Sequence, residues 1–212
     1  MNCSGSAIGW GDIDHTYDAL LQAWYPGQEG GTAVADVLFG DYNPSGKLPV
    51  TFYKSTDQLP EFTNYSMENR TYRYFKGEPQ YAFGYGLSYT DFEFGNAMLS
   101  SSSIKSGEKV TISIPLTNKG KRDGAEVVQV YVKSLSNPEA PIKSLKGYAR
   151  QELKAGESTE VIITLEPESF AYYNADIDGL TVFPGKYKIL YGNSSKDIDL
   201  KALNLEVMPN EG

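Results

Sequence analysis

The sequence contains very few of the residues from which catalytic and metal sites are most often built. Its 212 residues include a single cysteine, Cys3, and a single histidine, His15. One cysteine excludes an intramolecular disulfide and says nothing about the redox compartment. Transition metals need clustered His, Cys or carboxylate ligands, so we expect no metal site and no cofactor. A lone histidine also disfavours Ser-His-Asp and Cys-His catalysis.

Long basic runs and long apolar runs are missing as well. Lysine and arginine total 19 against 27 aspartates and glutamates, which gives a formal net charge of −8. No basic run alternates with aromatic residues, so we expect no nucleic-acid partner. No segment approaches the roughly 20 apolar residues of a membrane span, and the first residues lack the basic and apolar regions of a signal peptide. We therefore expect no membrane partner.

In the second half of the chain, apolar residues recur with a period of two, which is typical of strands with one face in a core. The pattern predicts a mainly β chain that ends in a seven-stranded, immunoglobulin-like sandwich. The serine run from Ser100 to Ser103 is expected to be a solvated turn. The predicted strands are Phe92 to Leu99, Lys109 to Asn118, Glu126 to Lys133, Ile142 to Arg150, Ser158 to Leu165, Lys186 to Tyr191 and Leu200 to Val207.

The first 52 residues follow a β, α, β order. Apolar residues from Ala33 to Leu38 have helical spacing, and Gly40 follows as a left-handed cap. Before the helix, the apolar run within residues 17–27 fits a strand or a short helix equally well. After it, Leu48 to Phe52 is predicted as a short strand. This segment is too short to cover both faces of a parallel sheet, so we expect the last unit of a larger α/β domain.

The segment between these two parts has little periodicity and many polar and aromatic residues, which predicts a long ordered connector. Aromatic rings can stack on sugars, and they can equally hold two domains together. Composition leaves both alternatives open, and we favour domain packing. The aromatic residues that gather near the sandwich are Tyr72, Tyr74, Phe75, Tyr81, Phe83, Tyr85 and Tyr89.

Carboxylates are the remaining catalytic candidates, because glycoside hydrolysis uses a pair of them. Nothing in the sequence around any one of them indicates a catalytic environment, so solvated surface charge explains them better. The glycine-rich segment 26–31 lacks the Walker and G-x-G-x-x-G patterns, and a turn into the helix explains it better than a phosphate site. The carboxylate candidates are Glu29, Asp36, Asp41, Asp91 and Glu93.

Two long segments resemble a known family. AWYPGQEGGTAVADVLFGDYNPSGKLPVTF and, after it, YRYFKGEPQYAFGYGLSYTDFEF are similar to the C-terminal region of glycoside hydrolase family 3, which includes β-glucosidases. Asn118 to Gly120 and Gly124 to Val132 match the family's downstream pattern. The resemblance covers essentially the whole chain. It implies an α/β sandwich remnant over residues 1–52, an ordered linker over 53–87, and a fibronectin type III-like β-sandwich over 88–212.

For a full-length relative, the resemblance implies hydrolysis of β-glycosides with retention of configuration. The family's nucleophilic aspartate lies in an N-terminal barrel, and its acid/base glutamate lies upstream of the YPGQEGG segment. Neither role can be carried onto a residue of this chain, so the catalytic residues are expected to be none here. We expect a C-terminal fragment that is inactive alone and supports the missing N-terminal catalytic domains. Its parent would be periplasmic or secreted, with carbohydrate as its substrate.

The resemblance also leads to expectations about contacts. If any residues of this chain lie near substrate in the parent enzyme, we expect them to be Tyr72, Tyr74 and Phe75. An α/β remnant without its partner strands would expose apolar side chains such as Val34 and Leu38, so residues 1–52 should pack on another copy of the chain or on the sandwich. The alternative function is a β-sandwich module that binds carbohydrate or a cell surface.

Overall fold

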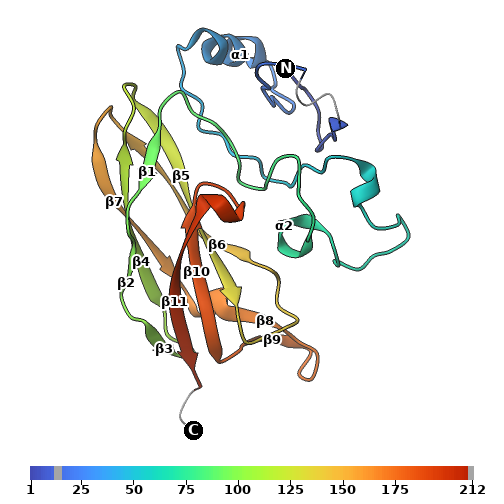
Figure 1. Cartoon of the computed structure of the whole chain (residues 1–212), viewed down its shortest axis with the longest axis vertical. Helices are drawn as coiled ribbons and strands as arrows, with labels where there is room; N and C mark the ends of the chain where they lie inside the picture. The colour runs from blue at the N-terminus through green and yellow to red at the C-terminus, as the bar shows by residue number, and fades with distance from the viewer. Residues whose placement is uncertain (12–15, 210–212) are drawn as a thin grey trace.

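The computed structural model describes residues 1–11 and 16–209 of the chain. A twisted β-sandwich occupies the C-terminal part, and the N-terminal part, which is rich in loops, lies beside one end and one side of it (Figure 1). His15, the one histidine weighed as a catalytic candidate, lies outside the described residues. Every helix among the described residues falls short of the length and apolar character that a membrane crossing requires.

One sheet of the sandwich is built around a long central strand, β4 (Val110–Asn118). Strand β7 (Ser158–Leu165) pairs with it antiparallel along most of its length. Two short strands, β1 (Phe92–Phe94) and β2 (Met98–Leu99), pair with β4 as well. Because β7 takes up one side of β4, the two short strands share the other side.

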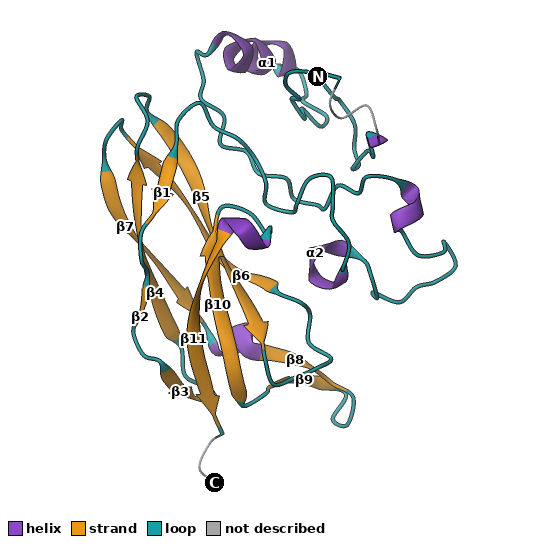
Figure 2. Cartoon of the chain, in the orientation of Figure 1, coloured by secondary structure: helices purple, strands orange, loops and turns teal. Residues whose placement is uncertain are grey.

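The second sheet has the order β3-β11-β10-β5-β6. Its members are β3 (Ser103–Lys105), β5 (Gly124–Ser134), β6 (Ser144–Leu153), β10 (Gly185–Gly192) and β11 (Leu200–Met208). All neighbours are antiparallel except β3 and β11, which are parallel. A separate hairpin of β8 (Ala171–Asn174) and β9 (Gly179–Val182) projects near the end of the sandwich where β6 begins (Figure 2).

The core lies between the two sheets and follows the predicted alternation. Ile112, Ile114 and Leu116 of β4 are fully buried, and Val128 and Val130 of β5 are fully buried in the same core cluster. Burial of apolar area on this scale is the main force that stabilises a sandwich. The β-sandwich predicted from the sequence is therefore confirmed, but not its predicted number of strands.

The strands differ from the prediction in three places. The first predicted strand is divided into β1 and β2 at Gly95, where a Cβ would lie 2.8 Å from Cβ of Pro115. The serine run was expected to be a turn, but Ser103 begins β3, because the end of β11 offers it a partner. The hairpin of β8 and β9 was not predicted, although Asp178 and Gly179, a typical hairpin pair, lie where its turn meets β9.

In the N-terminal part, α1 (Gly30–Phe39) ends at Gly40, whose φ of 82° is left-handed, as predicted. The predicted strand Leu48 to Phe52 is wrong. Residues 80–85 lie alongside this segment, but backbone hydrogen bonds join them only at Leu48 and Phe52, and Pro49 between these has no N–H to donate. The run before α1 is neither strand nor helix, and within it Gln22 makes a single parallel bridge to Asn2.

The remaining helices are short. They are the 3-10 helices η2 (Thr56–Gln58), η3 (Pro167–Phe170) and η4 (Asp197–Asp199), and the single-turn helix α2 (Thr71–Tyr74). Helix α2 lies beside β6, on the side of the sandwich that faces the N-terminal part (Figure 2). This places the predicted aromatic residues against the sandwich.

Candidate functional site

Strand β5 is buried on both of its faces. Val128, Val130 and Val132 face the sandwich core, while Gln129 and Tyr131 point the other way and are only 2% and 0% exposed. Their outer face is covered by residues 71–86 of the linker. We call this contact between residues 71–86 and strands β5 and β6 the junction.

Tyr72 lies at the centre of the junction. Its ring stacks on Phe83 with centroids 4.2 Å apart and meets Tyr131 edge to face at 5.8 Å. Its hydroxyl accepts a hydrogen bond of 2.9 Å from the backbone N–H of Leu145, at the start of β6. Burial raises the pKa of Tyr72, which keeps the phenol neutral. These contacts are those of a residue that joins two parts of a fold.

The neighbouring aromatic residues have different environments. Phe75 is 9% exposed and packs edge to face on Tyr53, with centroids 5.0 Å apart. Tyr74 is half-buried, and the Arg73 guanidinium lies 5.5 Å from its ring centroid. The three residues thus lie on one short segment, where Tyr72 and Phe75 pack on aromatic rings and Tyr74 lies against Arg73.

Helix α2 begins in a conformation that is unusual for its residue type. Thr71 has φ of 54°, in the left-handed region that a β-branched residue rarely adopts. Two hydrogen bonds hold Thr71 in this conformation. Its N–H donates a bond of 2.7 Å to the Tyr53 hydroxyl, and its own hydroxyl accepts a bond of 3.3 Å from the N–H of Arg73. Such conformations cost free energy and occur where the surroundings require them.

Polar side chains tie the linker and the N-terminal part to β5. Gln129 donates to the carbonyl oxygens of Gly84 at 3.0 Å and Asn193 at 2.7 Å, and it accepts from the Tyr131 hydroxyl. Lys47 forms a buried ion pair with Glu126, with Nζ and Oε1 2.8 Å apart. These contacts could not be predicted from the sequence, because no local pattern distinguishes a buried glutamine or glutamate from an exposed one.

A pocket of about 480 Å³ opens at the edge of the junction. Tyr72, Phe75 and Phe83 line part of it, and the 6% exposed Lys143 lines another part. The Lys143 ammonium donates to the carbonyl of Ser195 at 2.6 Å and also forms an ion pair with Asp197. Its charge is therefore already compensated.

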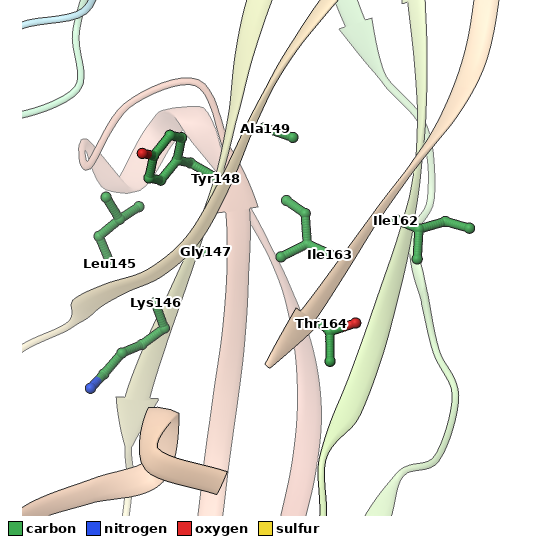
Figure 3. A pocket seen from close by; sticks show the side chains of 8 residues that line it. All are labelled: Leu145, Lys146, Gly147, Tyr148, Ala149, Ile162, Ile163 and Thr164. Carbon is green, nitrogen blue, oxygen red and sulfur yellow. The ribbon is translucent and has the colours of Figure 1, made fainter. Parts of the chain in front are cut away.

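A second pocket of about 510 Å³ lies between the edge strands β6 and β7 (Figure 3). Aliphatic and polar residues both line it: Leu145, Ala149, Ile162 and Ile163 on one hand, Lys146, Tyr148 and Thr164 on the other. Figure 3 shows the Lys146 side chain pointing away from Ile163. Catalysis at this pocket would need titratable groups that converge on it, and its walls do not supply them.

The carboxylate candidates do not converge either. Glu29 is the residue before α1 and accepts a hydrogen bond of 3.2 Å from Thr32, as expected for a turn into a helix. Glu93 of β1 forms an exposed ion pair with Lys119 at 3.0 Å. Among the described residues, the one buried carboxylate is Glu126, which pairs with Lys47. No group of His, Cys, Asp or Glu within the described ranges could hold a metal ion.

Comparison with known proteins agrees with this architecture. Residues 1–89 match the glycosyl hydrolase family 3 C-terminal domain, and residues 126–195 match a fibronectin type III-like domain. The chain belongs to glycoside hydrolase family 3. The resemblance seen in the sequence is thereby confirmed, and so is the fibronectin type III-like character of the sandwich.

Curated relatives of this family 3 chain are much longer than it is. It is 51% identical to a xylan 1,4-beta-xylosidase of Xylanibacter ruminicola, over 97% of this chain and 24% of the relative. It is 40% identical to a periplasmic beta-glucosidase of Salmonella typhimurium, over 86% of this chain and 25% of the relative. The family 3 chain thus spans about a quarter of the length of these relatives.

Solved structures show the same fold. A beta-glucosidase from Listeria innocua in complex with isofagomine superposes with a TM-score of 0.82 at 31% identity, over 98% of this chain and 30% of that one. A beta-glucosidase from Kluyveromyces marxianus superposes with a TM-score of 0.82 at 33% identity, over 98% of this chain and 27% of that one. The N-terminal part, the linker and the sandwich of the family 3 chain therefore follow a known arrangement.

Proposed function

We propose that this family 3 chain is the C-terminal, non-catalytic part of a glycosidase that hydrolyses β-glycosides with retention, and that its sandwich braces the catalytic domains. The observation that carries the proposal is the junction. Residues 71–86 cover Gln129 and Tyr131 so completely that the sandwich and the segment leading to it form one continuous structure. The buried carboxylate of Glu126 is engaged by Lys47 and is unsuited to act as a nucleophile.

Complementation tests the proposal directly. The catalytic domains of the Xylanibacter ruminicola relative, prepared without their own C-terminal quarter, would be mixed with this chain and assayed on chromogenic β-xyloside and β-glucoside. We expect no turnover by the chain alone, and higher activity or a higher midpoint of thermal inactivation in the mixture than for the catalytic domains alone. Turnover by the chain alone would contradict the non-catalytic role.

A second candidate function is saccharide contact at Tyr72, Tyr74 and Phe75. The half-buried Tyr74 ring favours it, since a partly accessible aromatic face can stack on a sugar. Binding to insoluble β-glucan that is lost in Tyr74→Ala would support this function. Tyr72→Ala would be the weaker test, because Tyr72 also supports the fold.

The surface of residues 1–52 is proposed to contact the catalytic domains and, when these are missing, a second copy of the chain. Support comes from Tyr25, Leu38 and Phe39, which are 80%, 65% and 83% exposed around α1, while Val34 is half-buried. Large apolar side chains that gather on a surface indicate a contact. Light scattering should show a dimer that Leu38→Lys with Phe39→Lys dissociates, and a monomer at all concentrations would contradict self-association.

We further propose that the chain is organised as residues 1–52, a linker over 53–87 and a sandwich over 88–212. Phe62 and Tyr65 are 92% and 91% exposed in the linker, so brief chymotrypsin treatment should cut there first. The C-terminal product should resist further digestion. A first cut within the sandwich would contradict this division.

The parent protein is proposed to be exported. Support comes from one relative, which is named a periplasmic beta-glucosidase. Fractionation of source cells, with detection by an antibody against the sandwich, would test this. Recovery in the cytoplasmic fraction alone would contradict it.

A further inference from the structure

Two cationic side chains meet where α2 packs against the beginning of β6. The backbone N–H of Ile142 donates a hydrogen bond of 2.7 Å to the carbonyl oxygen of Arg73. The N–H of Leu145 donates one of 2.9 Å to the Tyr72 hydroxyl. These two bonds fix α2 beside the strand. Arg73 is thereby held next to Lys146, the residue after Leu145.

A β-bulge sets the direction of Lys146. Tyr131 of β5 pairs with Leu145, and Val130 pairs with Gly147, so Lys146 is the extra residue on β6. A bulge of this kind re-aims a side chain and is common beside functional sites. In Figure 3 the Lys146 side chain accordingly leaves the gap between β6 and β7 and points away from Thr164.

Neither cation has an anionic partner among the described residues. Other cations of the described chain do form ion pairs, among them Lys143 with Asp197 and Arg150 with Glu152, but Arg73 and Lys146 form none there. Burial lowers the pKa of Lys146, and the nearby charge of Arg73 lowers it further. Two half-buried positive charges without compensation are unfavourable, and an anion between them would relieve this cost.

A donor of Arg73 itself lacks a partner. The Arg73 Nε is buried and makes no hydrogen bond within the described chain. Unsatisfied buried donors are rare in folded proteins and often mark an absent ligand or water. The Tyr74 ring contacts one face of the guanidinium, whose carbon lies 5.5 Å from the ring centroid, and leaves the donor edge of the guanidinium free of that contact.

We propose that Arg73 and Lys146 form a binding site for a carboxylate, and that the ligand is the uronic acid unit of an acidic saccharide. A planar guanidinium matches a carboxylate with two parallel hydrogen bonds, while the ammonium supplies further donors. The Tyr74 ring offers the apolar face that a sugar ring requires. The choice of a sugar acid rests on the proposed function, which takes the ligand of the family 3 chain to be carbohydrate.

Calorimetric titration of the whole chain with D-glucuronate, D-glucose and acetate at low ionic strength tests this. We expect glucuronate to bind more tightly than both others, because only it has the carboxylate and the ring together. Equal binding of glucose and glucuronate would overturn the carboxylate site. Equal binding of acetate and glucuronate would overturn the assignment to a sugar acid. Both results leave the complementation test of the proposed function unaffected, so the two failures can be told apart.

Variants locate the site. Arg73→Gln and Lys146→Met should each weaken glucuronate binding by about tenfold or more, since each removes a charge-assisted hydrogen bond. Lys188→Met, on the exposed side of β10, is the matched control and should bind as the unaltered chain does. If Arg73→Gln does not fold, as judged by circular dichroism, Lys146→Met alone decides. Unchanged affinity in Lys146→Met would overturn the site.

Discussion

Lys47 and Glu126 form an ion pair of 2.8 Å across the contact between the N-terminal part and β5, with side chains only 10% and 5% exposed. The Lys47 ammonium also donates a hydrogen bond of 2.8 Å to the carbonyl oxygen of Gly86. Removing one partner leaves a buried charge without compensation. We therefore expect Lys47→Met to lower the free energy of unfolding by about 3 to 5 kcal/mol.

Urea unfolding measures this change, and an exposed pair provides the control. Lys119 and Glu93 are 3.0 Å apart with side chains 59% and 60% exposed. Lys119→Met should change the free energy of unfolding by less than about 1 kcal/mol. Equal effects of the two variants would show that the pair of Lys47 is solvated.

Gly84 should tolerate no side chain. Its φ is 79°, and a Cβ there would lie 2.0 Å from Oε1 of Gln129. Gly156 has a similar φ of 76°, with nothing within 4 Å of an added Cβ. Gly156→Ala should therefore cost about 1 to 2 kcal/mol from backbone strain alone. Gly84→Ala should cost clearly more in the same unfolding experiment, and an equal cost would mean that Gln129 moves aside freely.

Tyr72 should matter for its ring more than for its hydroxyl. Tyr72→Phe keeps the stack on Phe83 and leaves the N–H of Leu145 unpaired, so we expect a loss of about 1 to 3 kcal/mol. Tyr72→Ala also opens a cavity and should cost about 3 to 5 kcal/mol. Thermal unfolding of both variants checks the order. A larger loss in Tyr72→Phe than in Tyr72→Ala would contradict the packing role.

Alkaline pH should destabilise the sandwich. Burial raises the pKa of Tyr172 and of Tyr187 to about 12 from an ordinary value of 10.0. Above pH 10 the unfolded chain loses these protons while the folded chain keeps them, so stability is fully present below pH 10 and falls as pH rises toward 12. The urea midpoint should therefore fall through this range, and by less in Tyr187→Phe.

The control for that measurement is Tyr25→Phe, at a position that is 80% exposed. It removes one tyrosine without altering the core. The pH dependence of Tyr25→Phe should follow that of the unaltered chain. If the pH dependence of Tyr187→Phe also followed that of the unaltered chain, burial of Tyr187 would not contribute to the loss of stability at alkaline pH.

The sandwich could be predicted because its signal is local. Alternation along β4 shows which side chains enter the core, and the helix with its Gly40 cap is likewise encoded within a few residues. The predicted strand at Leu48 failed for the opposite reason. Whether it forms a regular ladder depends on residues 80–85, which bond to it only at Leu48 and Phe52, and the local sequence does not show this. The short β3 was missed because its partner, β11, lies at the far end of the chain.

The candidate sites could be predicted only in part. The aromatic residues were identified as a cluster, but their roles depend on β5 and β6, which are distant in sequence. Arg73 and Lys146 carry no pattern of their own. Their proximity depends on a bulge, on the hydrogen bond from the Ile142 N–H to the Arg73 carbonyl and on the one from the Leu145 N–H to the Tyr72 hydroxyl. None of these can be recognised from the order of residues.

The double burial of β5 has a consequence for exchanging domains among relatives. The linker behaves as a third layer laid over the sandwich, so the unit that can be transplanted is larger than the sandwich. A graft beginning at residue 88 would leave Gln129 and Tyr131 facing water on a host that lacks the matching cover. Chimaeras joined upstream of Thr71 should keep their solubility, because the sandwich then travels with the segment that shields it.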